Sequence, residues 1–368
     1  MANWEEKQEK DFSSIRKVRV IEMSNEKIKC VVWDLDNTLW DGVLAETNHV
    51  ELKRNVTEII KEIDRRGILQ SISSKNEHDL AMKKLREFGL EEYFLYPQIN
   101  WNSKAKAIET IAASFNFNAN TFAFIDDQQF ERDEVAFHHP EVLCIDAASV
   151  SVILDMDRFM PKYVTEDSKN RRILYMHDIV RNEKEQEYVG VKEEFLRTLD
   201  MRLVISKAKV EDLKRIEELT VRTHQLNSTG TIYSFDELSE MINLDNYIVL
   251  IAQMEDIYGT YGKIGLCVIE EKMGIWNVKL LLMSCRVMSK GVGSVLMDYV
   301  MKKAKSRGKH LLADFIPTDR NRIMYITYRF NGFKEISNCE GKIVFEADLS
   351  IDKEYPDYIV VIEDKAIS

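Results

Sequence analysis

The chain has few cysteines, and no two of them stand close enough to form a CxxC pair. Scattered cysteines of this kind are typical of reduced thiols rather than of a disulfide framework or a zinc site. We therefore expect a cytoplasmic protein. The five cysteines are Cys30, Cys144, Cys267, Cys285 and Cys339.

Long hydrophobic runs are also missing. No apolar stretch is long enough to span a bilayer. The residues from Met1 to Lys10 are mostly polar and charged, unlike a secretory signal peptide. We expect neither a membrane anchor nor a secretory leader.

An excess of positive charge is absent, since the formal net charge is -11. This balance argues against nonspecific binding to nucleic acid or to an anionic membrane, but it leaves room for a local basic patch. With 45% hydrophobic and 31% charged residues among 368, the composition indicates a globular chain that forms two domains.

Strands and helices alternate before about Val150, which predicts a parallel sheet with helices on both faces. The expected strands lie at 28–35, 68–73, 121–125 and 142–145, and the expected helices at 51–66, 77–88, 104–116 and 129–137. We expect an N-terminal tail at 1–26, a first domain at 27–150, a charged helical connector at 151–200, a second domain at 201–350 and a C-terminal tail at 351–368.

Two aspartates close the first expected strand. The run Lys29 to Trp33 is mostly apolar and lacks alternation, as in a buried strand of a parallel sheet. Asp34 and Asp36 then stand at its carboxyl end, where open α/β sheets place their ligands. One carboxylate can attack a phosphoryl group, and the second can handle the proton of the leaving group or of water.

Three later segments supply what such chemistry needs. A strand ends in a polar group whose hydroxyl and backbone amides can bind phosphate, and Lys104 opens a helix with a positive charge that offsets carboxylate–phosphate repulsion. Another strand ends in two aspartates, which suit Mg²⁺. The candidate phosphate-binding residues are Thr38, Ser74, Lys75, Asn76 and Lys104, and the candidate Mg²⁺ residues are Asp34, Asp36, Asp126 and Asp127.

Each segment has a plainer interpretation. Ser74 can be a helix N-cap, Lys104 a solvated helix residue, and Asp126-Asp127 the cap of the helix from Glu131 to Phe137. Together, however, the order DxDxT, Ser, Lys and Asp-Asp resembles the haloacid dehalogenase-like (HAD) superfamily. That resemblance implies that Asp34 is the nucleophile, Asp36 the general acid/base, Ser74 and Lys104 phosphate ligands, and Asp126 and Asp127 part of a Mg²⁺ site.

The second half contains a glycine turn between a strand and a helix. Lys290, Gly291 and Gly293 stand in this turn, whose backbone amides can meet a pyrophosphate. A plain glycine-rich turn is the alternative. The arrangement resembles the α+β fold of the acyl-CoA-dependent N-acetyltransferases (GNAT), although Met288 replaces the polar residue usual at the first position. Such a turn can instead grip the phosphopantetheine arm of a carrier protein.

The two halves together resemble the FkbH-like family, in which a HAD domain is fused to a GNAT-like domain. That resemblance implies transfer of a glyceryl unit from 1,3-bisphosphoglycerate to the thiol of an acyl carrier protein in polyketide-type biosynthesis, with loss of phosphate. It rests on Asp34–Trp40, Ser74–Asn76, Trp101 with Lys104, Phe124–Asp127 with Glu131-Arg132, Arg222–Asn227, Ser284–Val287 and Pro317–Asn321.

Four residues of the second half are candidates for acyl transfer. Cys285 follows an apolar strand and precedes Arg286, which can stabilise a thiolate, so it is the candidate for a covalent acyl relay. His224 and Asn227 can polarise the acyl carbonyl or position the thiol. The plainer alternatives are a small packed cysteine and a hydrogen-bonded histidine at a helix end.

Three functions remain open on sequence alone. The first is glyceryl transfer to a carrier protein, the second is a stand-alone phosphatase of a small metabolite with the second domain as a specificity module, and the third is a non-catalytic binding module. The intact set of aspartates, serine and lysine argues against the third.

Overall fold

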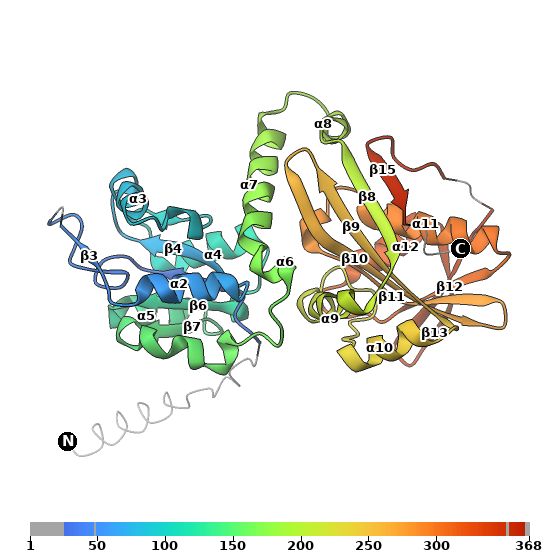
Figure 1. The fold of residues 1–368 in the computed structure, drawn as a ribbon, viewed down its shortest axis with the longest axis horizontal. Coiled ribbons are helices and arrows are strands. Elements are labelled where there is room, and N and C mark those ends of the chain that lie inside the picture. Colours follow the sequence, from blue (N-terminus) through green and yellow to red (C-terminus); the bar gives the residue numbers. More distant parts are fainter. Residues whose placement is uncertain (1–25, 48, 351–352, 365–368) are drawn as a thin grey trace, which may run out of the picture. The chain divides into compact units, whose positions relative to one another are not determined.

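The computed structural model describes residues 26–47, 49–350 and 353–364. Contacts divide the chain after Lys162 into two compact units. Each unit has its own sheet and hydrophobic core (Figure 1).

The first unit is built on a five-stranded parallel sheet in the order β5-β4-β1-β6-β7. All four residues of β1 are buried, which explains its central place and its lack of alternation. Val31 and Trp33 join the isoleucines of α2 in one core. The strands are β1 (Cys30–Trp33), β4 (Leu69–Ser74), β5 (Gln98–Ile99), β6 (Phe122–Asp126) and β7 (Leu143–Asp146), and the helices are α2 (Val56–Arg65), α3 (His78–Glu87), α4 (Lys104–Phe115) and α5 (Gln129–His138).

The prediction for this unit is confirmed except near residue 51. Instead of a helix from 51 to 66, residues 51 and 52 form β3 (Glu51–Leu52), which pairs with β2 (Trp40–Asp41). Helix α2 begins only at Val56, after Asn55 takes a left-handed conformation. The Trp40 ring in this hairpin is fully buried. Its burial stabilises the pairing of β2 with β3 more than helix propensity would stabilise an extension of α2 back to residue 51.

The second unit contains an eight-stranded mixed sheet in the order β13-β14-β12-β11-β10-β9-β8-β15. Only β11 with β12 and β15 with β8 run parallel. The strands are β8 (Met201–Lys207), β9 (Tyr247–Asp256), β10 (Gly259–Lys272), β11 (Ile275–Met283), β12 (His310–Phe315), β13 (Phe333–Cys339), β14 (Lys342–Ala347) and β15 (Ile359–Glu363). The helices are α6 (Glu166–Lys169), α7 (Arg171–Glu187), α8 (Lys192–Thr198), α9 (Leu213–Arg222), α10 (Phe235–Asn243), α11 (Val292–Ser306) and α12 (Arg322–Phe330).

The predicted α/β class, with a parallel sheet first and an α+β unit second, is confirmed by these strand orders. The prediction of a C-terminal tail at 351–368 is wrong for residues 359–363. These form β15, which pairs with β8 because its alternate residues Ile359 and Val361 pack on the core. The N-terminal tail predicted at 1–26 lies almost wholly outside the described residues. Within the described residues, no helix has the length and apolar character needed to cross a bilayer.

Strands β11 and β12 separate after a short parallel pairing that ends at Val278 and Ala313. The segment Leu226–Ser228 fills the split. Leu226 O accepts from Met283 N at 2.9 Å, Ser228 N donates to Leu281 O at 2.9 Å, and Ile316 N donates to Ser228 O at 3.0 Å. The chain itself therefore satisfies the backbone groups that the separating strands leave open.

Helix α7 lies in the predicted connector but is tied to the second unit. The Arg181 side chain is 1% exposed and makes a two-pronged contact with Asp256, from Nε at 2.7 Å and from Nη2 at 2.8 Å. Asp256 also accepts from the Tyr261 hydroxyl at 2.8 Å. This buried pair fixes α7 to the β9–β10 hairpin.

We predict that Arg181→Ala lowers the free energy of unfolding of the second unit by about 3–5 kcal/mol, because Asp256 keeps its buried charge without its partner. Arg197→Ala is the control, since Arg197 and Asp357 form an exposed pair, and it should cost about 1 kcal/mol or less. Urea unfolding followed by circular dichroism measures both. Equal losses in the two variants would contradict the anchoring role of Arg181.

Candidate active site

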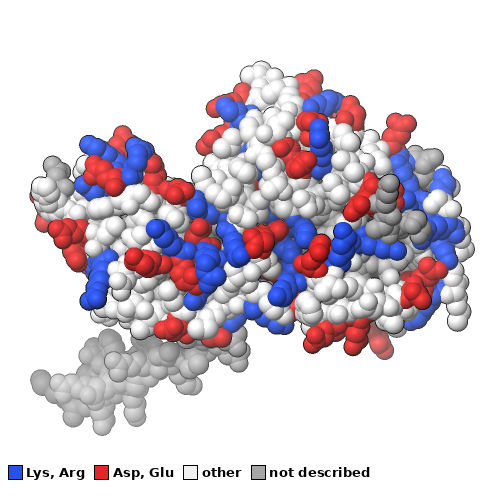
Figure 2. All heavy atoms as spheres, viewed as in Figure 1, with Lys and Arg blue, Asp and Glu red and all other residues white. Residues whose placement is uncertain are grey.

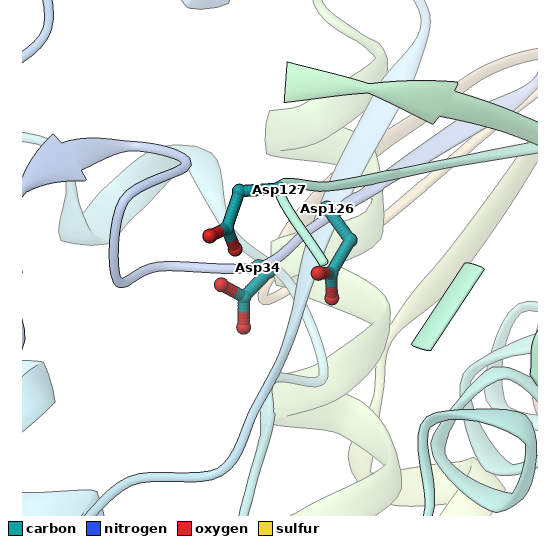
Figure 3. Close-up of side chains that lie close together, drawn as sticks. All are labelled: Asp34, Asp126 and Asp127. Atoms are coloured by element: carbon teal, nitrogen blue, oxygen red, sulfur yellow. The ribbon is translucent and has the colours of Figure 1, made fainter. Parts of the chain in front are cut away.

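Three aspartates meet at the carboxyl edge of the parallel sheet (Figure 3). Asp34 follows β1, and its N–H donates to Ile125 O at 2.9 Å, which continues the ladder with β6. Asp126 ends β6 and Asp127 comes directly after it. Ligand oxygens of these three carboxylates lie within 4.8 Å of one another. The sequence-based prediction that separate strand ends come together is therefore confirmed for these residues.

Lys104 supplies the positive charge of this cluster. It opens α4, whose N-cap Ser103 accepts from Lys106 N at 3.2 Å. The Lys104 ammonium, only 3% exposed as a residue, contacts the Asp34 carboxylate and lies 3.3 Å from Asp126 Oδ2. It also donates to Ser73 O at 2.6 Å. The interpretation of Lys104 as a solvated helix residue is therefore wrong.

Burial governs the protonation of the cluster. It raises the pKa of Asp34, against the opposing charge of Lys104. Burial and the charge of Asp34 raise the pKa of Asp126 to about 6. Burial also disfavours charge on Lys104, but the two aspartates outweigh it and hold the pKa of Lys104 above its ordinary value. One ammonium thus compensates two crowded carboxylates only in part.

The cluster fits a divalent cation. Asp127 Oδ1 is buried and has no hydrogen-bond partner, and the buried Asp126 Oδ2 has only the ion-pair contact with Lys104 at 3.3 Å. Such oxygens are costly to leave unsatisfied, and hard cations such as Mg²⁺ take oxygen ligands. Asp34, Asp126 and Asp127 would hold the ion.

The Asp36 side chain has a different environment. Its Oδ1 accepts from Trp40 Nε1 at 2.8 Å and Leu44 N at 3.1 Å, and its Oδ2 accepts from Asn76 Nδ2 at 2.9 Å. The carboxylate is therefore oriented by the β2 hairpin and stands apart from the three-aspartate group. These hydrogen bonds engage the side-chain oxygens of Asp36 and leave its backbone carbonyl as the atom by which it would serve a metal ion. The roles of Asp36 as general acid/base and as part of the metal site stay predictions.

Thr38, Ser74 and Asn76 lie at the site, but they also organise it. Thr38 is 1% exposed, and its Oγ1 accepts from Asp127 N at 3.0 Å. Asn76 Nδ2 donates to Asp36 and, at 3.4 Å, to Ser74 Oγ. The Asn76 Oδ1 atom is buried without a partner. Direct phosphate contacts from these residues stay a prediction.

Lys75 makes an ion pair with Glu131 of α5 at 2.7 Å. Its charge is therefore already balanced, because Glu131 is buried and needs a cation there. The pair joins the loop after β4 to the helix after β6, across the end of β1. Phosphate binding by Lys75 stays a prediction.

Arg132 is a positioning residue that the motif analysis did not single out as a site residue. Its Nη1 donates to Asp126 O at 2.8 Å, and its Nη2 donates to Asp146 Oδ2 at 2.6 Å. Asp126 Oδ1 also accepts from Gln128 N at 2.8 Å. Arg132 follows Asp126 by six residues, which places it in the first turns of α5. This spacing is the feature of the sequence from which its position could have been predicted.

In the second unit, Cys285 and His224 each lie two residues from a backbone hydrogen bond that joins their chain segments, between Met283 and Leu226. Cys285 begins a short 3-10 turn, Cys285–Val287, just after β11, and it is half-buried. His224 lies in the turn after α9, two residues before Leu226, which bonds to Met283 at the end of β11. The fold therefore brings the two turns to the same end of β11.

Asn227 has a structural task. It is 1% exposed, and its Oδ1 accepts from Thr229 N at 3.1 Å and Gly230 N at 2.7 Å, while its Nδ2 donates to Thr231 O at 3.4 Å. Its polar atoms are thus occupied by its own turn, as in an Asx turn. The predicted contact of Asn227 with the acyl group is not supported.

The glycine turn is shaped as predicted. Gly291 has φ 74° and caps α11, a conformation that favours glycine, and a side chain there would meet the Tyr358 hydroxyl at 3.0 Å. A side chain at Gly293 would make an ordinary 3.5 Å contact with Met283 Cγ. Tyr358 thus lies directly over the turn.

Of the two cations beside this turn, Lys290 is buried and Arg286 is half-buried. The Lys290 ammonium lies 5.8 Å from the Tyr261 ring centroid, and burial lowers the pKa of Lys290. Burial also lowers the pKa of Arg286, while Asp178 and Tyr175 favour its charge. Arg286 Nη1 is buried without a hydrogen-bond partner. Binding of an anion by these two residues stays a prediction.

Comparisons with known proteins match the two units separately. Residues 10–136, about a third of the chain, match the family model described as haloacid dehalogenase-like hydrolase. No curated protein sequence matches the chain.

Among solved structures, the Mg-complexed phosphatase domain of protein BF1531 from Bacteroides fragilis is 27% identical, with a TM-score of 0.32. That match covers 34% of this chain and 38% of the other, so this chain spans well under two thirds of it. The ribosomal-protein-S18-alanine N-acetyltransferase of Escherichia coli is 14% identical over 41% of this chain and 97% of its own, with a TM-score of 0.33. The PaiA N-acetyltransferase of Thermoplasma acidophilum, in complex with coenzyme A, is 19% identical over 39% and 98%, also with a TM-score of 0.33.

We predict that Mg²⁺ raises the melting temperature more at about pH 7.5 than at about pH 5. The folded-state pKa of Asp126 is raised to about 6, so the metal-free protein loses stability as the pH rises through that value, and below it the metal must displace a proton. Thermal-shift titrations measure the increment, with Asp127→Asn as a variant that should reduce it at both pH values. Equal increments at the two pH values in the wild type would contradict this account.

Proposed function

We propose that this protein couples Mg²⁺-dependent phosphoryl chemistry in its first unit to transfer of a glyceryl or related acyl unit in its second. The donor is 1,3-bisphosphoglycerate, and the acceptor is the phosphopantetheine thiol of an acyl carrier protein. The observation that carries the first part is the group of Asp34, Asp126 and Asp127 compensated by Lys104. The match to the haloacid dehalogenase-like model supports it. The identities of the donor and the acceptor are those that the resemblance to the FkbH-like family implies.

The first unit carries out phosphate release in two displacements. An Asp34 oxygen attacks phosphorus, the bond to the leaving oxygen breaks, and that oxygen takes a proton from Asp36. The ionised Asp36 then removes a proton from a water molecule, which attacks the aspartyl-phosphate, releases phosphate and restores both side chains. Bound Mg²⁺ would neutralise charge on the phosphoryl oxygens.

The surroundings of Asp36 suit this exchange of a proton. Its Oδ1 accepts two hydrogen bonds, but its Oδ2 accepts only one, from Asn76. The free lone pair of Oδ2 can carry the proton, while Trp40 and Leu44 hold the group in place. Lys104 keeps Asp34 oriented and available as an anion, because its ammonium favours the ionised carboxylate.

The second unit carries out acyl transfer. The Cys285 thiolate attacks the activated carbonyl of the acyl phosphate, the bond from that carbon to the phosphate oxygen breaks, and inorganic phosphate leaves. The carrier thiol then displaces Cys285 by thioester exchange, and the Cys285 thiolate is regenerated. His224, held at the same end of β11, is the candidate base that takes the thiol proton. The first unit acts on a phosphate ester at the other end of the donor, so the two steps are chemically independent.

A stand-alone phosphatase is the second candidate. It is favoured by one observation, namely that all residues of the phosphoryl site come from the first unit. In that case release of phosphate from a small metabolite needs no carrier, and Cys285 is dispensable.

We predict that Asp34→Asn reduces Mg²⁺-dependent phosphate release to background and that Asp36→Asn reduces it by about 10²–10⁴-fold, the usual contribution of a positioned acid or base. Asp155→Asn, at an exposed position of the same unit, should leave the rate unchanged. A coupled phosphate assay with a small phosphate ester measures all three. Wild-type turnover by Asp34→Asn would overturn the assigned nucleophile.

Intact mass spectrometry tests the transfer. The protein, a phosphopantetheinylated carrier, Mg²⁺ and 1,3-bisphosphoglycerate generated in situ are incubated together. We expect a glyceryl-sized gain on the carrier and a transient gain on this protein that Cys285→Ala abolishes and Cys339→Ala, at an exposed cysteine, retains. Phosphate release without any gain on either protein would favour the stand-alone phosphatase.

A further inference from the structure

Helix α12 of the second unit presents an apolar stripe to solvent. Ile323, Ile326 and Phe330 are 38%, 41% and 81% exposed, and their spacing of three and four residues places them on one helix face. The opposite face, with Met324 and Tyr328, is buried in the core. The helix is therefore fixed to the sheet by one side and offers the other.

The same exposed side is basic. Arg322 and Arg329 flank the apolar stripe, both are exposed, and no acidic residue occurs between Arg322 and Phe330. Elsewhere the visible surface mixes acidic and basic side chains (Figure 2). In a chain of net charge -11, a helix face with two arginines and no carboxylate is a distinct feature.

The nearest acidic neighbours on either side are engaged. Asp319 Oδ2 lies 3.4 Å from Arg320 Nε, and Glu335 Oε2 accepts from the Tyr325 hydroxyl at 3.2 Å. A further cation lies at the end of the helix, because Lys353 Nζ donates to Phe330 O at 3.4 Å. Glu335 keeps its negative charge beside Tyr325, so the positive charge of the face lies at its two ends, at Arg322 and at Arg329 with Lys353.

The residues at both ends of α12 contact segments that lie next to the end of β11 or follow the glycine turn, on either side of Cys285 in the chain. At the start, Asn321 Nδ2 donates to Asn227 O at 2.9 Å, in the segment that fills the split between β11 and β12. At the far end, Asn331 Nδ2 donates to Ser294 Oγ at 3.2 Å, in the first turn of α11 after the glycine turn. A partner seated on α12 would therefore contact a helix that is hydrogen-bonded to the segment beside the end of β11 and to the first turn of α11.

We propose that the exposed face of α12 docks an acidic amphipathic helix of the acyl carrier protein, with Ile323, Ile326 and Phe330 as apolar contacts and Arg322 and Arg329 as charge partners. This inference rests on the proposed function and assigns the surface that recognises its acceptor. Charge complementarity selects the occupant, because opposite potentials favour encounter and suppress wrong partners. A second copy of this chain is a poorer partner, since a two-fold contact through α12 would set arginines against arginines.

The test measures binding of the apo carrier, which lacks the arm, and loading of the phosphopantetheinylated carrier. We expect Arg322→Glu/Arg329→Glu to weaken binding of the apo carrier, measured by calorimetry, at least tenfold. The KM for the phosphopantetheinylated carrier should rise by a similar factor, while kcat and Mg²⁺-dependent phosphate release from a small phosphate ester stay unchanged. Arg202→Glu/Lys214→Glu, at exposed positions of the same unit, changes the net charge equally and should have no such effect.

A second pair of variants, matched for the exposure of the ring that is removed, tests the apolar stripe. Phe330→Ala should weaken carrier binding, whereas Phe137→Ala should not, although the two rings are 81% and 82% exposed. Unchanged binding in both α12 variants, with loading retained, would overturn the docking surface and leave the proposed function standing. A wild-type protein that neither binds nor loads the carrier would overturn the proposed function and the docking inference with it. Loss of binding to phosphatidylserine vesicles with unchanged carrier binding would assign the face to a membrane instead.

Discussion

The contact between the Lys104 ammonium and the carboxylates of Asp34 and Asp126 is the interaction on which the first unit depends. A central parallel strand must be buried on both faces, so the residue at its end enters a region that little water reaches. Two carboxylates at the ends of β1 and β6 would repel each other there. A single buried cation stabilises the arrangement without neutralising it fully, and the remaining negative charge suits a divalent cation.

Around that contact, the other polar groups fix positions rather than add charge. Thr38 and Arg132 hold Asp127 and Asp126 by their backbone atoms, while Trp40, Leu44 and Asn76 hold Asp36 by its oxygens. Asp34, the proposed nucleophile, thus lies in a crowded ionic group, whereas the side chain of Asp36, the proposed general acid/base, is held by neutral hydrogen-bond donors. Two aspartates two residues apart acquire different properties because the hairpin β2–β3 folds over only one of them.

Much of this could be read from the sequence, because it follows from local pattern. Unbroken apolar runs gave the strands of the parallel sheet, and the residues after them had to meet at one edge. What local pattern cannot show is which polar atoms find each other across the sheet. Lys75 and Glu131 are 56 residues apart, and the turn around Asn227 uses that side chain for itself. Strand β15 escaped prediction because five residues form a stable strand only where a neighbour with a free edge exists.

The position of β15 has a consequence for biosynthesis. All elements of the parallel sheet precede Lys162, so the first unit can complete its hydrogen bonding while the second is still being translated. The edge of β8, by contrast, stays unpaired until residues 359–363 emerge, more than 150 residues after β8 itself. During that interval β8 is an open template for other strands, which is the situation that chaperones guard against. The two units therefore differ in their exposure to misfolding, although they share one chain.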